Sequence, residues 1–176
     1  MIHNLAFSDV IFQQITGTAT SSENMSCFPY YTEGEVIKGF GRGSKELGIP
    51  TANFPEDVVK KLPEEIQGGV YYGWANVDNG PVYEMVMSIG NNPYYKNEKR
   101  SMETHIIHTF NEDFYGSTLK TVMLGFIRPM KNFSSLDELV TEIHADIFHA
   151  KEKLELPENS SHKHSNFFYG SDNKQT

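Results

Sequence analysis

The chain has a single cysteine, Cys27, so it cannot form an intrachain disulfide bond, and a reducing compartment fits this composition better than secretion does. It has no run of about 18 apolar residues, the length that a membrane-spanning helix needs. Residues Met1 to Met25 contain no lysine or arginine, which argues against an arginine-rich mitochondrial transit peptide. We therefore expect a cytoplasmic protein that is not bound to a membrane, with the mitochondrion as the alternative compartment.

Positive charge is also scarce. The sequence has 15 Lys and Arg against 23 Asp and Glu, a formal net charge of −8. A chain of this charge repels phosphodiester backbones at long range, so non-specific binding of nucleic acid is disfavoured. Any phosphate that the protein binds must therefore be held by a local group of donors.

The length of 176 residues and a hydrophobic fraction of 38% are suited to one folded domain with its own core. We expect a poorly ordered extension over residues 1–27, the folded domain over 28–157 and a tail over 158–176. The tail is either loose or anchored by its only aromatic triplet, Phe167 to Tyr169. Nothing in the sequence indicates an obligate dimer, so we expect a monomer.

Five short runs are rich in β-branched and aromatic residues and are bounded by Gly, Pro and Asn, which is typical of strands. Between two of them, Val77 to Gly80 contains Asn-Gly, a pair that tolerates the positive φ of a tight hairpin turn. We therefore expect antiparallel neighbours in a sheet or barrel. The runs are EGEVIKGF, GGVYYGWANV, PVYEMVMSIG, SMETHIIHTF and LKTVMLGFI.

Two helices are predicted. A short one follows Pro55, over residues 56–62. A longer one begins after Ser135, whose hydroxyl can cap it while Glu138 reaches back from three residues later, and it ends at Pro157. Apolar residues at steps of three and four give this helix one stripe that can lie on the sheet: Leu136, Leu139, Val140, Ile143, Ile147, Ala150 and Leu154.

The segment from Gly39 to Pro55, GFGRGSKELGIPTANFP, concentrates glycine with the cations Arg42 and Lys45. Glycines allow close backbone approach, which together with two cations suits a polyphosphate. The spacing is not that of a Walker A loop, so the usual mononucleotide-binding fold is disfavoured. On composition alone, a flexible turn is the more common reading of such a loop.

The whole string GFGRGSKELGIPTANFP closely resembles the signature of the riboflavin kinase family. The resemblance continues through GVYYGWANV, MVMSIGNNPYYKN, SMETHIIHTFNEDFYG, GFIRPMKNF and LELPE, and so covers essentially Glu33 to Phe168. It implies a mainly β fold, a six-stranded antiparallel Greek-key barrel with a C-terminal helix, which agrees with the strands and helix predicted from pattern. It also implies transfer of phosphate from ATP to the 5′-hydroxyl of riboflavin, giving FMN and ADP.

The resemblance implies three catalytic roles. Thr51 and Asn53, in the PTAN motif, would bind Mg²⁺ through their side-chain oxygens, with Zn²⁺ as an alternative ion, and Glu103 would be the catalytic base. Mg²⁺ prefers oxygen ligands, and ATP supplies the anionic ones, so two neutral protein oxygens suffice. Without the resemblance, Thr51 and Asn53 would be taken for turn residues, and Glu103 for an exposed strand carboxylate.

Further residues are assigned to the two substrates. The resemblance places Gly39 and Lys45 near the ATP phosphates and His108 and Tyr115 near the adenosine. On the other side, a mobile flavin-side segment, Gly125 to Phe133, would contact the flavin through Arg128, Lys131 and Phe133. Many relatives have Pro-Glu after the arginine, whereas this chain has Pro129 and Met130. Phe133 could equally be a hydrophobic anchor ahead of the long helix.

Two alternatives stay open at this point. His105 and His108 are three apart on a strand and so point to opposite faces, which disfavours a structural zinc site. The rival function is a binding barrel for flavin or oligonucleotide that has lost the reaction, since small barrels host many binding functions. Net acidity argues against the oligonucleotide, and the joint presence of Thr51, Asn53 and Glu103 argues against a dead enzyme.

Overall fold

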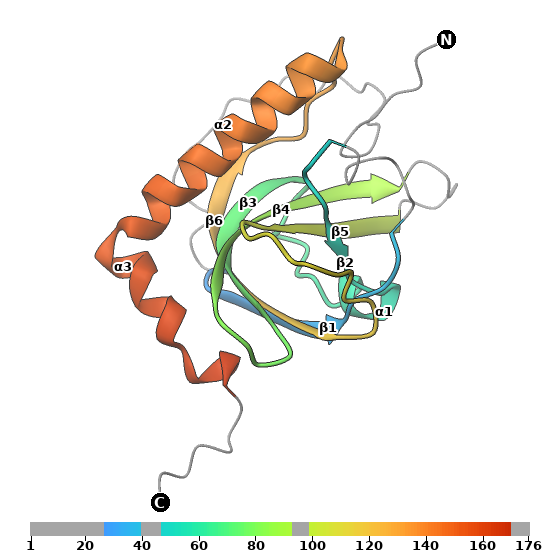
Figure 1. Ribbon diagram of the computed structural model, residues 1–176. Coiled ribbons are helices and arrows are strands. Elements are labelled where there is room, and N and C mark those ends of the chain that lie inside the picture. Colours follow the sequence, from blue (N-terminus) through green and yellow to red (C-terminus); the bar gives the residue numbers. More distant parts are fainter. Residues whose placement is uncertain (1–26, 40–46, 93–98, 170–176) are drawn as a thin grey trace, which may run out of the picture.

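The computed structural model describes residues 27–39, 47–92 and 99–169, which form a curled antiparallel sheet with a long helix against one side (Figure 1). The sheet has the strand order β1-β6-β3-β4-β5-β2. A bridge between Ile37, just after β1, and Asn53 of β2 joins the two edges, so the sheet closes into a barrel. The strands are β1 (Tyr30–Glu35), β2 (Ala52–Asn53), β3 (Gly69–Val77), β4 (Tyr83–Asn92), β5 (Lys99–Ile106) and β6 (Thr118–Arg128). The predicted fold class is confirmed.

Alternation along the strands separates an inner from an outer face of the barrel. On β4, Met85, Met87 and Ile89 point inward and are fully buried. The interior is filled mainly by such methionines and aliphatic side chains, and each one buried contributes roughly 1.5–3 kcal/mol relative to exposure. The residues between them, Val86 and Ser88, therefore face outward, and both are buried under other parts of the chain.

The hairpin between β3 and β4 is confirmed, but its turn residues differ from the prediction. Asp78 and Asn79 adopt positive φ, at 51° and 57°, and the Gly80 amide donates to the Val77 carbonyl over 2.9 Å. The left-handed pair is thus Asp-Asn, one position before the predicted Asn-Gly. Asp78 is further held because its carboxylate accepts a hydrogen bond from the Thr118 amide at 2.7 Å.

The long helix α2 (Leu136–Glu155) covers the outer face of β3 and β4 (Figure 1). As predicted, the Ser135 hydroxyl caps it by accepting from the Glu138 amide. The carboxylate of Glu138, however, accepts from the amide and hydroxyl of Ser134, so the reciprocal half of the predicted cap is shifted by one residue. Four members of the predicted stripe are buried: Leu139, Ile143, Ala150 and Leu154. Leu136, at the start of the helix, is exposed.

Residues after α2 pack back onto the barrel. The helix α1 (Glu56–Val59) is shorter than predicted, and α3 (Pro157–Ser160) is followed by the 3₁₀ turns η1 (Ser161–His164) and η2 (Asn166–Phe168). Phe168 is fully buried against Trp74 and Val122, and its carbonyl accepts from Asn76 at 3.1 Å. Within the described part of the tail, Phe168 of the aromatic triplet is therefore anchored on the barrel, whereas Tyr169 is exposed. Among the described helices, none combines the length and apolar character that crossing a membrane requires.

Candidate functional site

The candidate site is centred on the pairing of β2 with β5. Asn53 of β2 lies opposite Glu103 of β5, and Glu103 in turn lies opposite Ser88 of β4. Directly opposed residues in an antiparallel pair project to the same face, with Cβ atoms about 4.5–5.5 Å apart. The structure therefore brings the predicted metal ligand Asn53 and the predicted base Glu103 to neighbouring positions on the outer face of the barrel.

Gly39 closes one side of this site. A Cβ added to Gly39 would meet the carboxamide of Asn53, coming within 2.9 Å of its Cγ. The absence of a side chain at position 39 thus lets the backbone touch Asn53, a residue that is only 7% exposed. The Asn53 amide nitrogen faces the Thr51 carbonyl at 3.5 Å, which leaves Oδ1 as the carboxamide atom able to serve a cation. Lys45 lies outside the described residues.

These residues fit the implied ion. Asn53 and the half-buried Thr51 offer neutral oxygen donors two positions apart, next to a glycine backbone that a nucleotide could approach. Mg²⁺ favours such a hard oxygen set when a polyphosphate supplies the remaining ligands. The geometry of Gly39 and Asn53 is therefore compatible with a nucleotide-bound divalent cation.

His105 links β5 to the PTAN motif, a role that sequence reasoning missed. It lies two residues beyond Glu103, so both side chains project from the same face. Its Nδ1 is 2.9 Å from the Pro50 carbonyl. A carbonyl can only accept, so Nδ1 carries the proton and the neutral ring keeps its lone pair on Nε2. Burial is the main cause that lowers the pKa of His105, which favours this neutral form.

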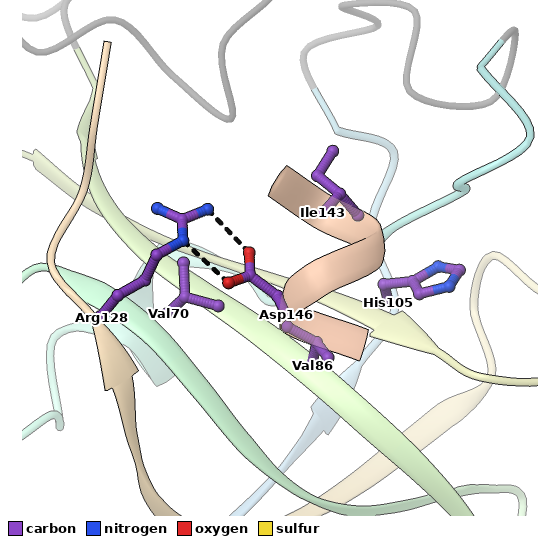
Figure 2. A pocket seen from close by; sticks show the side chains of 6 residues that line it. All are labelled: Val70, Val86, His105, Arg128, Ile143 and Asp146. Carbon is purple, nitrogen blue, oxygen red and sulfur yellow. Dashed lines mark hydrogen bonds and ion pairs between the residues drawn. The ribbon is translucent and has the colours of Figure 1, made fainter. Parts of the chain in front are cut away.

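A small pocket lies between the sheet and α2, next to the row that carries Glu103. Val70, Val86 and His105 line it from the sheet, and Ile143 lines it from α2. Figure 2 shows the helix segment with Ile143 and Asp146, with Arg128 on one side of it and His105 on the other. Val70 is opposite Ser88 in the strand register, and Ser88 is opposite Glu103, so the pocket and the predicted base are neighbours. This pocket is much smaller than a site that encloses an organic ligand, so it marks only the narrow gap between α2 and the sheet beside Glu103.

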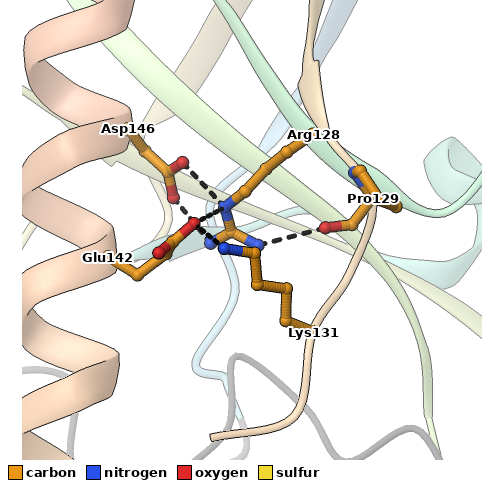
Figure 3. Close-up of polar contacts among 5 residues, drawn as sticks. All are labelled: Arg128, Pro129, Lys131, Glu142 and Asp146. Carbon is orange, nitrogen blue, oxygen red and sulfur yellow. Dashed lines mark hydrogen bonds and ion pairs between the residues drawn. The ribbon is translucent and has the colours of Figure 1, made fainter.

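Arg128 lies at the edge of this pocket, in an ion pair with Asp146 of α2 (Figure 3). Its Nε donates to one carboxylate oxygen at 2.8 Å and its Nη2 to the other at 2.7 Å, while Glu142 is 3.1 Å from Nε. Asp146 is only 4% exposed. Burial raises the pKa of Asp146, and the hydrogen bonds and charge of Arg128 oppose that rise. The predicted flavin contact Arg128 is thus already tied to α2.

The rest of the flavin-side segment is held by the same face of α2. The Lys131 ammonium forms an ion pair with Glu142, and the Arg128 guanidinium lies over the Phe133 ring at 5.8 Å from its centroid. Phe133 packs with Leu139 and Ile143, which agrees with the hydrophobic-anchor alternative. Met130 packs against the cluster of Val70, Val86 and Ala150, so this departure from the family pattern has a packing role.

The two residues assigned to adenosine lie between β5 and β6. The His108 ring stacks on Tyr83, with centroids 4.0 Å apart, and meets Phe110 edge-on. Tyr115 is 53% exposed, and the next residue, Gly116, donates its amide to the Val36 carbonyl at 2.9 Å. That bond places Tyr115 beside the strand that leads to Gly39, whereas His108 belongs to an aromatic cluster.

Three comparisons with known proteins agree with one another. A family model described as riboflavin kinase matches residues 26–154. The chain is 59% identical over 150 residues to the riboflavin kinase of Homo sapiens, covering 85% of this chain and 97% of that one. It is 48% identical over 146 residues to the riboflavin kinase of Pyricularia oryzae, covering 74% and 73% of the two chains. The crystal structure of riboflavin kinase from Trypanosoma brucei superposes with a TM-score of 0.65 at 29% identity, over 80% of this chain and 89% of that one.

Proposed function

The chain belongs to the riboflavin kinase family, and on that premise we propose that it transfers the γ-phosphoryl group of ATP to the 5′-hydroxyl of riboflavin, releasing FMN and ADP. The observation that carries this proposal is the pairing of Asn53 with Glu103 across β2 and β5. It supports a site in which Asn53 holds the metal ion bound to the nucleotide and Glu103 contacts the hydroxyl group of riboflavin.

Glu103 acts as the base in this proposal. Its carboxylate accepts the proton as the 5′-oxygen of riboflavin attacks the γ-phosphorus, and the bond from that phosphorus to the β–γ bridging oxygen breaks. Phosphoryl transfer requires little covalent work from a protein, so orienting the hydroxyl matters as much as removing its proton. The strand position supports this role, because β5 is fixed on both sides by β4 and β2.

Thr51 and Asn53 hold the divalent cation, and we propose Mg²⁺. When bound with ATP, this ion neutralises charge on the phosphate oxygens. Gly39 supports the same site because its bare backbone abuts Asn53. Lys45 adds a cation near the phosphates, with His108 and Tyr115 on the adenosine side.

The flavin lies toward α2 in this proposal. Val70 lies in the same cross-strand row as Glu103, and Val86 pairs with His105 in the next row on that face, so an aromatic ring placed beside this apolar face would lie close to the base. The aromatic ring of Phe133 and the ammonium of Lys131 flank the entrance. The Arg128 guanidinium contacts the flavin with its planar face and one edge, while its Nε and Nη2 groups stay hydrogen-bonded to Asp146.

The test is a direct assay. Purified protein is incubated with riboflavin, ATP and Mg²⁺, and FMN and ADP are separated chromatographically. Stoichiometric formation of both products supports the proposal. Binding of riboflavin without turnover would favour the rival, a flavin-binding barrel that has lost the reaction.

A further inference from the structure

Two acidic residues of α2, which no sequence signature singled out, contact the flavin-side segment at two of its three proposed ligand contacts. Asp146 binds Arg128, and Glu142 lies against both Arg128 and Lys131. The two carboxylates are four residues apart and so lie one above the other on the same side of the helix. Figure 3 shows both reaching from α2 toward the segment that leaves β6.

The contact with Asp146 fixes direction as well as distance. Two parallel N–H···O bonds of 2.7 and 2.8 Å hold the guanidinium in one plane, which a single ion contact would not do. The Arg128 side chain is 12% exposed and that of Asp146 is 5% exposed, so water competes little for either partner. Two cations against two carboxylates leave this group formally neutral.

The guanidinium of Arg128 also contacts other residues of the flavin-side segment. Its Nη1 donates to the Pro129 carbonyl at 3.1 Å, and its plane lies over the Phe133 ring. The Lys131 ammonium is held by Glu142, whose Oε1 also lies near Nε of Arg128. Only residues 129–135 separate β6 from α2. The contacts of Arg128 and Lys131 with α2 therefore determine the path of this connecting segment beside the pocket.

We propose that Asp146 and Glu142 are positioning residues for riboflavin: they hold Arg128 and Lys131, and through Arg128 the ring of Phe133, in the pose that receives the flavin. The inference rests on the proposed function and deepens it. Neither carboxylate touches the reacting atoms, so both act through the flavin-side segment. The ATP side is built around Gly39 and Asn53, which take no part in the hydrogen bonds and ion pairs that hold Arg128 and Lys131 on α2.

A purely structural ion pair would behave differently. Removing one partner of a buried pair leaves the other charge uncompensated, which destabilises the fold without favouring one substrate. A positioning role instead separates the two substrates. Loss of a carboxylate would weaken riboflavin binding while leaving ATP binding intact.

The experiment compares Asp146→Asn and Glu142→Gln with matched controls on exposed faces of the same helix, Asp137→Asn and Glu152→Gln. Loss of one charged hydrogen-bonding partner predicts that the KM for riboflavin rises roughly tenfold, while the KM for ATP stays within about twofold. Quenching of riboflavin fluorescence in the presence of ADP and Mg²⁺ should show a matching rise in Kd. Hydrogen exchange should quicken at amides of residues 130–135 and stay unchanged in the sheet.

Unchanged riboflavin KM and Kd in Glu142→Gln, or equal effects on both substrates in the two variants, would overturn the inference. If Asp146→Asn fails to fold, the Glu142→Gln variant alone tests the inference. Glu142 is more exposed than Asp146, and its replacement leaves the two hydrogen bonds between Arg128 and Asp146 in place. Failure of the wild-type protein to form FMN would contradict the proposed function instead. The riboflavin Kd and the exchange rates would still test the positioning role in that case.

Discussion

Asn53 and Glu103 stand directly opposite each other in the register of β2 and β5, although 50 positions separate them in the chain. β2 has only two residues, yet Asn53 also bridges Ile37 on its other side. The closure of the barrel and the assembly of the site therefore depend on the same residue. Disturbing Asn53 or its surroundings should affect catalysis before it affects the interior, which lies on the opposite face.

Removing the hydroxyl of Thr51 should weaken use of the metal. Thr51→Val keeps the shape of the side chain but loses an oxygen ligand, so we expect the Mg²⁺ concentration for half-maximal rate to rise roughly tenfold. The measurement is a Mg²⁺ titration of FMN formation at fixed ATP. Thr51→Ser, which keeps the hydroxyl, is the control and should titrate nearly as the wild type does. Coincident curves for the valine and serine variants would remove Thr51 from the metal site.

Gly39→Ala should damage the site while sparing the fold. The new Cβ would press into the Asn53 carboxamide, so that side chain must move from its position beside Glu103. We expect a loss of kcat of at least about tenfold with a Tm within a few degrees of the wild type, because no interior residue is disturbed. The control is Gly68→Ala, whose Cβ would approach the Ile89 carbonyl only to 3.4 Å. Full activity of Gly39→Ala would show that close approach at this position is unimportant.

His105 should make stability depend on pH. Its pKa is lowered in the folded protein, chiefly by burial. As the pH falls through about 6.5, His105 therefore becomes protonated in the unfolded chain while it stays neutral in the folded protein. The free energy of unfolding should therefore fall as the pH drops through about 6.5, and level off below the folded pKa. His105→Asn, which can still donate to the Pro50 carbonyl, should flatten this dependence.

Denaturant unfolding at pH 7.5 and 5.5 measures the effect on stability. The matched control is His149→Asn on the exposed face of α2, which should retain the slope of the wild type. Equal slopes for the two variants would exclude His105 as the source. His105→Phe, which cannot donate to Pro50, should in addition lower activity relative to His105→Asn, because the bond at 2.9 Å fixes the start of the PTAN motif.

The C-terminal turns should contribute to stability. Phe168 is fully buried, and its replacement by alanine should cost about 3–5 kcal/mol, the usual loss for a buried aromatic ring. Tyr169→Ala removes a neighbouring ring that is 42% exposed and should cost far less. Urea denaturation of both variants checks this. A loss below about 1 kcal/mol for Phe168→Ala would mean that the segment after α2 packs only loosely.

Sequence pattern predicted the elements better than the contacts between them. The stripe and cap of α2 follow from local spacing, and the placement of Glu103 and His105 on one common face follows from strand alternation. Asp146 escaped notice because a lone carboxylate on a helix is usually solvated, and its partner Arg128 lies on another element. The bond from His105 to Pro50 joins residues 55 positions apart. Such pairings depend on sheet closure, which no local pattern encodes.

In the hairpin turn and in the cap of α2, the sequence pattern predicted the feature but not the residues that form it. Both were predicted in the right place, yet the positive φ fell on Asp78 and Asn79, and Glu138 reached Ser134. Asp and Asn both tolerate the left-handed region, so composition alone does not fix the register of the turn. In this chain the hydrogen bond from the Thr118 amide to Asp78 adds a constraint from β6.

The most direct test of the account is the turnover of Glu103→Gln. The glutamine keeps the size of the side chain but cannot accept the hydroxyl proton, so kcat should fall by roughly 10²–10⁴, while the Kd values for riboflavin and for ADP with Mg²⁺ stay close to wild type. FMN formation at the wild-type rate by this variant would contradict the central claim that Glu103, set opposite Asn53, is the base of the reaction.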